Sequence, residues 1–299
     1  MKRAGASLSP ASCAMALRVL VTGSTGYVGR FLVPALEKDG HRVVGVSRSA
    51  STAMDLCNAS EYSRVLEEVV PDVIVHTAAS SSPAKCEADE EATMQQNVPK
   101  GFAQKAKEVN ASVRFIFLST DQVLDGKGHL VDEEADARPV NVYGRSKLEM
   151  EKVVKALFDN HAIFRLSFIF GPEVEGAHST FLQFALEKLR QKKEFNAFAD
   201  QIRSCIFIHD VVEALRLAVK GHIEGTVNLG GPEALSRLDF CRIVARHVGM
   251  AESIVQGSAY DLPTPSPADI SMNIARLRTA MGRSTVSLAD ALATMDAKL

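Results

Sequence analysis

The sequence has few of the features that mark secreted, membrane or nucleic-acid-binding proteins. Its five cysteines are scattered and odd in number, and none forms a Cys-x-x-Cys pair, so we predict neither a disulfide framework nor a zinc site. No apolar run reaches the roughly 18 residues of a membrane span. The formal net charge of -2 gives no support for nucleic-acid binding. We therefore expect a cytoplasmic protein in a reducing compartment, without bound metal.

Acidic residues are missing from the start of the chain, where Glu37 is the first. Residues 1–16 carry Lys2 and Arg3 among serines and alanines, which is the composition of an organellar transit peptide. The alternative, which we favour, is an N-terminal tail before the first strand, with Met15 as a second start. Organellar targeting stays open.

Strand and helix patterns alternate from residue 17 onward. Apolar runs predict strands at 17–22, 42–47, 73–76, 113–118 and 163–168, and helical patterns lie at 27–39, 61–69, 91–108 and 142–158. Strands separated by helices form right-handed crossovers and a parallel sheet. Pro34 lies inside the first helical pattern, so either the helix is kinked there or its boundary lies elsewhere. We predict an α/β fold, a Rossmann doubly wound parallel sheet.

The pattern changes after Gly171-Pro172. Helices are predicted at 180–193, 210–219 and 236–248, strands at 194–198 and 226–229, and a loop contains Pro263, Pro265 and Pro267. The 46% hydrophobic content suffices for a sizeable core. We divide the chain into a tail (1–16), a nucleotide-binding domain (17–170) and a smaller substrate-binding lobe (171–299) interleaved with it.

A glycine-rich turn follows the first predicted strand. Gly23 permits the tight turn, Gly26 lets the backbone approach phosphate, and Gly29 lets the helix pack on the strand. Amides at the start of the following helix then face an anion. The alternative is an ordinary turn between strand and helix, which the place of this turn in a five-strand series disfavours.

The second predicted strand ends without the acid that usually holds the adenine ribose of NAD. Ser47 and Arg48 stand there instead, and an arginine can accept the 2′-phosphate of NADP. We therefore predict NADP(H) rather than NAD(H), the alternative being that Arg48 is a solvated loop cation. Asp55 and Leu56 are expected at the adenine, unless Asp55 caps the following helix. Small residues after the third strand, Thr77, Ala78 and Ala79, let a cofactor lie close, and His76 before them is expected to be packed.

Hydroxyl, carboxylate and amine groups suited to carbonyl chemistry follow the fourth strand. Reduction of a carbonyl needs an acid for the developing alkoxide. Tyr143 can donate that proton, Lys147 lies on the same helix face and favours the phenolate, and Thr120 can bond the carbonyl oxygen. The alternative is an exposed tyrosine and lysine on a surface helix. Asp121, at the end of the same strand, is a candidate substrate ligand.

Together these motifs resemble the extended short-chain dehydrogenase/reductases. Within them, Ser119–Gly126 and Asn141–Lys147 are similar to dTDP-4-dehydrorhamnose reductases and to the related regulatory β subunits of methionine adenosyltransferase. The resemblance implies a sugar-nucleotide substrate, a homodimer formed through the Tyr143 helix and, for the second group, a methionine adenosyltransferase catalytic partner. It implies a supporting role for Asn97 and a place for Arg165 beside the nicotinamide or substrate. The expected cofactor contacts are Gly23, Thr25, Gly26, Tyr27, Val28, Gly29, Ser47, Arg48, Asp55, Leu56, Thr77, Ala78, Ala79, Asn97, Ser119, Tyr143 and Lys147.

Two positions depart from the reductase pattern. Gln122 stands where the reductases have a tyrosine, which leaves the exact sugar open. Because Gln122 follows Asp121, the chain lacks the acid pair that sugar-nucleotide dehydratases use, and this argues against dehydration. Arg203, before His209 and Asp210, resembles the diphosphate-binding arginine of sugar-nucleotide epimerases, although it could be a loop cation. Three functions stay open in this order: an NADPH-dependent reductase of a 4-keto-6-deoxy sugar nucleotide, an NADP-binding regulatory subunit, and an NAD-dependent epimerase.

Overall fold

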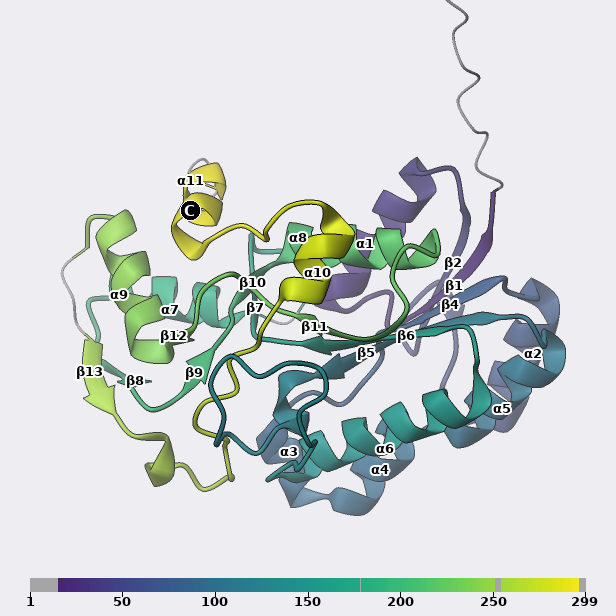
Figure 1. Cartoon of the computed structure of the whole chain (residues 1–299), viewed down its shortest axis with the longest axis horizontal. Coiled ribbons are helices and arrows are strands. Elements are labelled where there is room, and N and C mark those ends of the chain that lie inside the picture. Colours follow the sequence, from purple (N-terminus) through teal and green to yellow (C-terminus); the bar gives the residue numbers. More distant parts are fainter. Residues whose placement is uncertain (1–15, 178, 251–253, 296–299) are drawn as a thin grey trace, which may run out of the picture.

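A seven-stranded parallel sheet forms the centre of the computed structural model, which describes residues 16–177, 179–250 and 254–295. Its strands follow the order β11-β6-β5-β4-β1-β2-β3, and each neighbouring pair is parallel (Figure 1). The bounds are β1 Arg18–Thr22, β2 Arg42–Ser47, β3 Thr52–Ala53, β4 Val73–His76, β5 Arg114–Thr120, β6 His161–Leu166 and β11 Gly225–Leu229. The predicted Rossmann sheet is confirmed. Except for Ala16, the predicted N-terminal tail lies outside the described residues.

Both faces of the sheet are buried, which explains its continuous apolar strands. In β5, Phe115 and Phe117 pack on one side, while Ile116 and Leu118 pack on the other. Helices α1 (Tyr27–Lys38), α8 (Ile208–Val219) and α10 (Ala275–Met281) cover the second side (Figure 1). The first side is covered by α2 (Ala59–Val69), α4 (Glu90–Asn97), α5 (Lys100–Val109) and α6 (Val142–Leu157), with α3 (Pro83–Ala88) beside α6.

One predicted helix is wrong. The pattern over 91–108 forms two helices, α4 and α5, because Pro99 follows Val98 and disfavours helical backbone at that residue. Pro34, by contrast, lies within α1, whose bounds match the prediction to within one residue.

The C-terminal part returns to the central sheet. Strand β11, which we expected in the smaller lobe, pairs with β6. The remaining helices are α7 (Phe181–Arg190), α9 (Arg237–His247) and α11 (Leu288–Met295), with short 3-10 turns η1 (Asp121–Val123) and η2 (Ala259–Asp261). Short strands pair as β7 (Ile169–Phe170) with β10 (Ile206–Phe207), β9 (Ile202–Arg203) with β12 (Leu235–Ser236), and β8 (Phe195–Phe198) with β13 (Ile254–Gly257). Among the described helices, none is both long and apolar enough to cross a membrane.

Candidate active site

The predicted cofactor and catalytic segments lie at one edge of the sheet. Strands β5, β4, β1 and β2 are consecutive neighbours, and the segments that follow their carboxyl ends carry most of the predicted site. The strand order reverses between β1 and β4, and such a switch point is where open α/β sheets bind ligands. The topology thus brings these segments into one row.

The glycine turn has the geometry that a pyrophosphate needs. Gly23 has φ +73°, and a Cβ there would lie 2.8 Å from the backbone nitrogen of Ala78. A Cβ on Gly29 would overlap the Gly23 carbonyl, so only glycine allows α1 to begin this close to β1. Gly26 starts α1, and no described side chain caps the helix there. The amides of this first turn are therefore available to an anion.

A cluster of hydroxyls and one arginine marks the end of β2. The Thr25 hydroxyl lies 3.0 Å from the Ser47 hydroxyl and 3.2 Å from that of Ser49. Arg48, between the two serines, is exposed. Neutral donors beside a cation are suited to a phosphate monoester, and no carboxylate follows β2 before Asp55.

The other predicted adenosine contacts have protein partners. The Asp55 carboxylate accepts from the Cys57 amide at 2.9 Å. Helix α2 is capped by Asn58, so the alternative in which Asp55 caps that helix is wrong. Leu56 packs, half-buried, against the core beneath β2. The Thr77 hydroxyl donates to the Thr22 carbonyl at 2.7 Å, which fixes the segment containing Ala78 and Ala79 after β4.

Tyr27 and Val28 form the first turn of α1. The Tyr27 hydroxyl donates to the carbonyl of Pro172 at 2.9 Å, which ties the glycine turn to the start of the C-terminal part of the chain. Val28 is 8% exposed and belongs to the core. In the structure both side chains therefore position the turn.

Tyr143 and Thr120 lie next to each other in the interior. Tyr143 is 8% exposed and Thr120 is 5% exposed, so the alternative of an exposed tyrosine is wrong. Burial raises the pKa of the Tyr143 phenol, and the neighbouring Thr120 hydroxyl lowers it. The Thr120 hydroxyl also donates to the Asp121 carboxylate at 3.2 Å. Since the pKa of Tyr143 lies above that of a free tyrosine, its phenol keeps its proton at neutral pH and is able to donate it.

Lys147 is buried one turn further along α6. Its Nζ lies 4.2 Å from the centre of the Phe117 ring, and the residue is 2% exposed. Burial lowers the pKa of Lys147 to about 7, and the charge of Glu151 opposes that shift. His76 stacks on the same Phe117 ring and bonds the Thr22 hydroxyl at 2.8 Å, which confirms that it is packed in the strand end.

The start of α6 is fixed by contacts with Gln122, the residue that stands where the reductases have a tyrosine. Asn141 caps the helix by accepting from the Gly144 amide, and its amide group donates to the Gln122 side chain at 2.9 Å. A Cβ on Gly144 would overlap the Gln122 carbonyl, so glycine lets α6 approach η1. Gln122 thus helps to orient the helix that carries Tyr143 and Lys147.

Glu151 was not among the predicted site residues, although it lies on the Tyr143–Lys147 face of α6. Its carboxylate accepts from the Ser119 hydroxyl at 2.6 Å and from Arg165 Nη2 at 3.1 Å. Arg165 also donates to the Glu133 carbonyl, and it is 4% exposed. Strand register explains why Glu151 meets both Ser119 and Arg165, because these two residues lie opposite each other on β5 and β6. The i, i+4, i+8 spacing on a helix could have identified Glu151.

Ser119 and Arg165 therefore bond within the protein. A substrate contact by Arg165 stays a prediction, and it would use the donors that Glu151 and Glu133 leave free.

Asn97 is also bonded within the protein: it donates to the Ser80 carbonyl and the Ser146 hydroxyl at 3.0 Å each. Asn97 is 1% exposed, so it is not a helix-surface amide.

Asp121, which is bonded to Thr120, and Arg203 form a second charged cluster. The Asp121 carboxylate accepts from the Ser167 hydroxyl at 2.9 Å. Burial raises its pKa, whereas the charge of Arg203 lowers it. Arg203 donates to the carbonyls of Ile202 and Ala268 at 2.7 Å and to that of Pro267 at 2.8 Å. Since Arg203 is 6% exposed, it is not a solvated loop cation.

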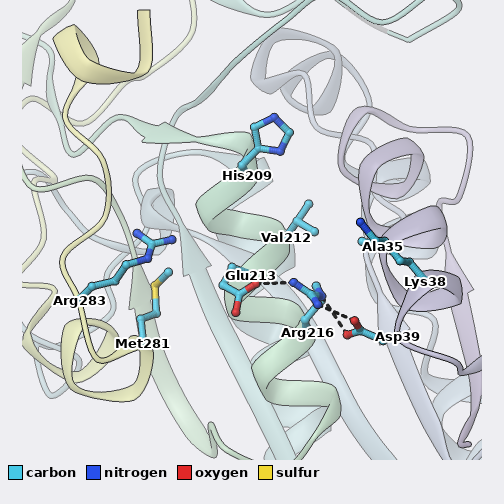
Figure 2. Close-up of a pocket in the computed structure, with 9 residues that line it drawn as sticks. All are labelled: Ala35, Lys38, Asp39, His209, Val212, Glu213, Arg216, Met281 and Arg283. Atoms are coloured by element: carbon cyan, nitrogen blue, oxygen red, sulfur yellow. Dashed lines mark hydrogen bonds and ion pairs between the residues drawn. The ribbon is translucent and has the colours of Figure 1, made fainter. Parts of the chain in front are cut away.

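A surface hollow of about 550 Å³ lies apart from this site (Figure 2). It is lined by side chains of α1, α8 and the end of α10, none of which is a predicted site residue. One of its cations, Arg216, is paired, since it bonds Asp39 at 2.9 Å and Glu213 at 2.6 Å. The described residues contain no cluster of three or more metal-ligating side chains.

Comparison with known proteins agrees with this architecture. The chain is 28% identical over 269 residues to dTDP-4-dehydrorhamnose reductase of Escherichia coli, covering 86% of this chain and 89% of that protein. It is 30% identical over 239 residues to methionine adenosyltransferase 2 subunit beta of Bos taurus, covering 76% of this chain and 71% of that protein.

A solved structure shows the same fold. The dTDP-4-dehydrorhamnose reductase of Bacillus anthracis, solved in complex with NADP, matches with a TM-score of 0.86 and 22% identity, covering 95% of this chain and all of that chain. The model of the RmlD substrate binding domain matches residues 17–299. The chain therefore belongs to the RmlD substrate-binding-domain family, whose named relatives include reductases of sugar nucleotides.

Proposed function

We propose that this protein is an NADPH-dependent reductase of a 4-keto-6-deoxy sugar nucleotide. The observation that carries the proposal is the buried group of Thr120, Tyr143 and Lys147 at the carboxyl end of β5. This group lies at the same edge of the sheet as the uncapped glycine turn. A protonated phenol beside a hydroxyl and an ammonium is the arrangement that carbonyl reduction requires.

The residues that would hold NADPH fit the molecule. The first turn of α1 offers amides to the pyrophosphate, and Arg48 with the hydroxyls of Thr25 and Ser47 offers donors to the 2′-phosphate. We expect Lys147 to bond the nicotinamide ribose. When bound, NADPH supplies the hydride.

The protein's own groups act on the carbonyl oxygen. Thr120, whose hydroxyl turns its proton from Asp121 to that oxygen, donates a hydrogen bond to it, and Tyr143 gives it a proton as negative charge develops. Lys147 in its charged form lowers the cost of the resulting phenolate. Because Thr120 and Tyr143 are buried, these dipoles act in a low-dielectric interior where they are worth more than in water.

The test is NADPH consumption with dTDP-4-dehydrorhamnose, with NADH measured in parallel. We expect turnover with NADPH, and a fall of about 10²- to 10⁴-fold in Tyr143→Phe with NADPH binding unchanged. Tyr260→Phe is the matched control, since that ring is 82% exposed. Wild-type turnover in Tyr143→Phe would refute the assignment of the acid.

A regulatory role is the second candidate. The similarity to methionine adenosyltransferase 2 subunit beta favours it, and an intact site does not argue against it. A protein that binds NADPH, reduces no sugar nucleotide and forms a stable complex with a methionine adenosyltransferase catalytic subunit would have this function instead.

A further inference from the structure

Arg237 is a half-buried cation that no part of the proposed mechanism uses. It is the first residue of α9, and its guanidinium lies 4.6 Å from the centre of the Phe181 ring and 4.9 Å from that of Phe168. Burial, with Arg203 nearby, lowers its pKa to about 10. Within the described parts of the chain its guanidinium has no hydrogen-bond or ion-pair partner, and its Nε is fully buried without an acceptor.

Backbone pairing holds Arg237 beside Arg203. Strand β12 runs antiparallel to β9 with Leu235 opposite Arg203, and the Arg237 amide donates to the Gln201 carbonyl at 3.1 Å. Asp121 is the one carboxylate whose charge acts on both arginines. The charge of Asp269 acts on Arg203 as well, but no carboxylate of the described residues is bonded to the Arg237 guanidinium. A half-buried cation without a hydrogen-bond partner is stabilised when an anion joins it.

We propose that Arg237 supplies the second guanidinium of a two-arginine clamp for the diphosphate of a nucleotide-linked substrate. The inference rests on the proposed function, because it places that substrate's diphosphate between Arg203 and Arg237. The two phenyl rings contact each other edge-to-face and lie together against the Arg237 guanidinium, which leaves its N–H groups as donors to two phosphate oxygens at once.

The position of the clamp agrees with the position of the acid. Asp121 is bonded to Thr120, and its charge acts on Tyr143 as well as on Arg237. A carbonyl at Tyr143 and a diphosphate at the arginines would therefore belong to one molecule spanning Asp121. A neutral carbonyl compound would leave the clamp empty, so Arg237 selects for nucleotide-linked substrates.

The experiment measures binding of dTDP and of inorganic pyrophosphate by calorimetry, with the protein saturated with NADP. We expect both to bind, and Arg237→Gln to weaken dTDP about 10- to 100-fold while NADP binding stays unchanged. Arg242→Gln, an exposed arginine of the same helix, is the matched control and should bind dTDP as the wild type does. If Arg237→Gln does not fold, Arg237→Met, which keeps an apolar side chain against the two rings, takes its place.

Two results would overturn the inference: wild-type affinity for dTDP in the Arg237 variant, or failure of the wild type to bind either dTDP or pyrophosphate. The second result with carbonyl reduction intact would leave the reductase function standing and remove only the clamp. Normal dTDP binding that depends on Arg237, without reduction of any sugar nucleotide, would do the reverse.

Discussion

Two groups of charged side chains lie near Thr120, and they differ in how their charges are matched. In the first, Glu151 bonds both Ser119 and Arg165, so each charge has a counter-charge. In the second, the charges of Asp121 and Asp269 act on Arg203, whereas the Arg237 guanidinium is bonded to no carboxylate of the described residues. A buried group whose charges are matched within the protein stabilises and orients. One with unmatched charge is costly until a ligand completes it, so the first group positions the catalytic helix and the second is suited to binding an anion.

The largest expected effect comes from breaking the group with matched charges, Glu151 with Ser119 and Arg165 (the matched group). Arg165→Met removes the hydrogen-bonded counter-charge of buried Glu151 and leaves only the long ion pair with Lys155 at 3.9 Å. We expect a loss of about 3–5 kcal/mol in the free energy of unfolding, measured by urea denaturation. The double variant Glu151→Leu/Arg165→Met should lose less than the sum of the two single changes. Lys100→Met breaks an exposed pair with Glu149 and should cost at most about 1 kcal/mol. Equal losses in the buried and exposed pairs would contradict the comparison.

The matched group should also set the pH dependence of turnover. Lys147 is charged below a pKa of about 7, so kcat/KM should fall as pH rises through 7. The Glu151 charge raises that pKa, and Glu151→Gln should therefore move the fall to lower pH. The other groups around the ammonium are the Phe117 ring and His76, which burial keeps neutral by lowering its pKa to about 3.

The control for this pH profile is Glu149→Gln. Glu149 lies on the same helix but pairs with the exposed lysines Lys100 and Lys152. Its removal should leave the profile where it is. An unchanged profile in Glu151→Gln, measured from NADPH absorbance across pH 5.5–9 (a window of about two units on each side), would show that Glu151 acts only on the fold.

Arg48 offers a comparison between an exposed cation and the buried ones. Arg48→Ala should weaken NADPH binding about tenfold and leave NADH binding unchanged, because only NADPH carries the 2′-phosphate. Arg42→Ala, at the opposite end of β2, should change neither affinity. Binding is measured by fluorescence titration. Equal losses for both nucleotides would place Arg48 outside the 2′-phosphate site.

The sequence predicts one of these two groups better than the other, and chain distance explains the difference. Tyr143, Lys147 and Glu151 follow a helical spacing, so one face of α6 can be read from local pattern alone. The partners of Arg165 and Arg237 come from distant segments: Arg165 meets Glu151 through strand register, and Arg237 meets Phe168 and Phe181 through the packing of α9 on α7. No local pattern distinguishes such a buried arginine from a surface one.

The same limit applies to the fold. The five strands from β1 to β6 that carry apolar runs are predictable, because parallel strands buried on both faces have that composition. The pairing of β11 with β6 depends on the chain's return from the smaller lobe, and nothing within 226–229 indicates it. The break between α4 and α5 was missed although Pro99 marked it, because the apolar spacing on both sides continues the same pattern.

The smallest expected effect is on the unmatched group. Arg237→Met removes a charge that has no hydrogen-bond or ion-pair partner within the described protein and replaces it with an apolar side chain against two rings. The variant loses a cation–π contact but no longer holds an unpaired, half-buried charge, so we expect the free energy of unfolding to change by less than about 1 kcal/mol. Urea denaturation without ligand measures this, and a dTDP concentration that saturates the wild type should stabilise the wild type more than the variant. A loss comparable to that of Arg165→Met would mean that Arg237 serves the fold, and the contrast between the two groups would then fail.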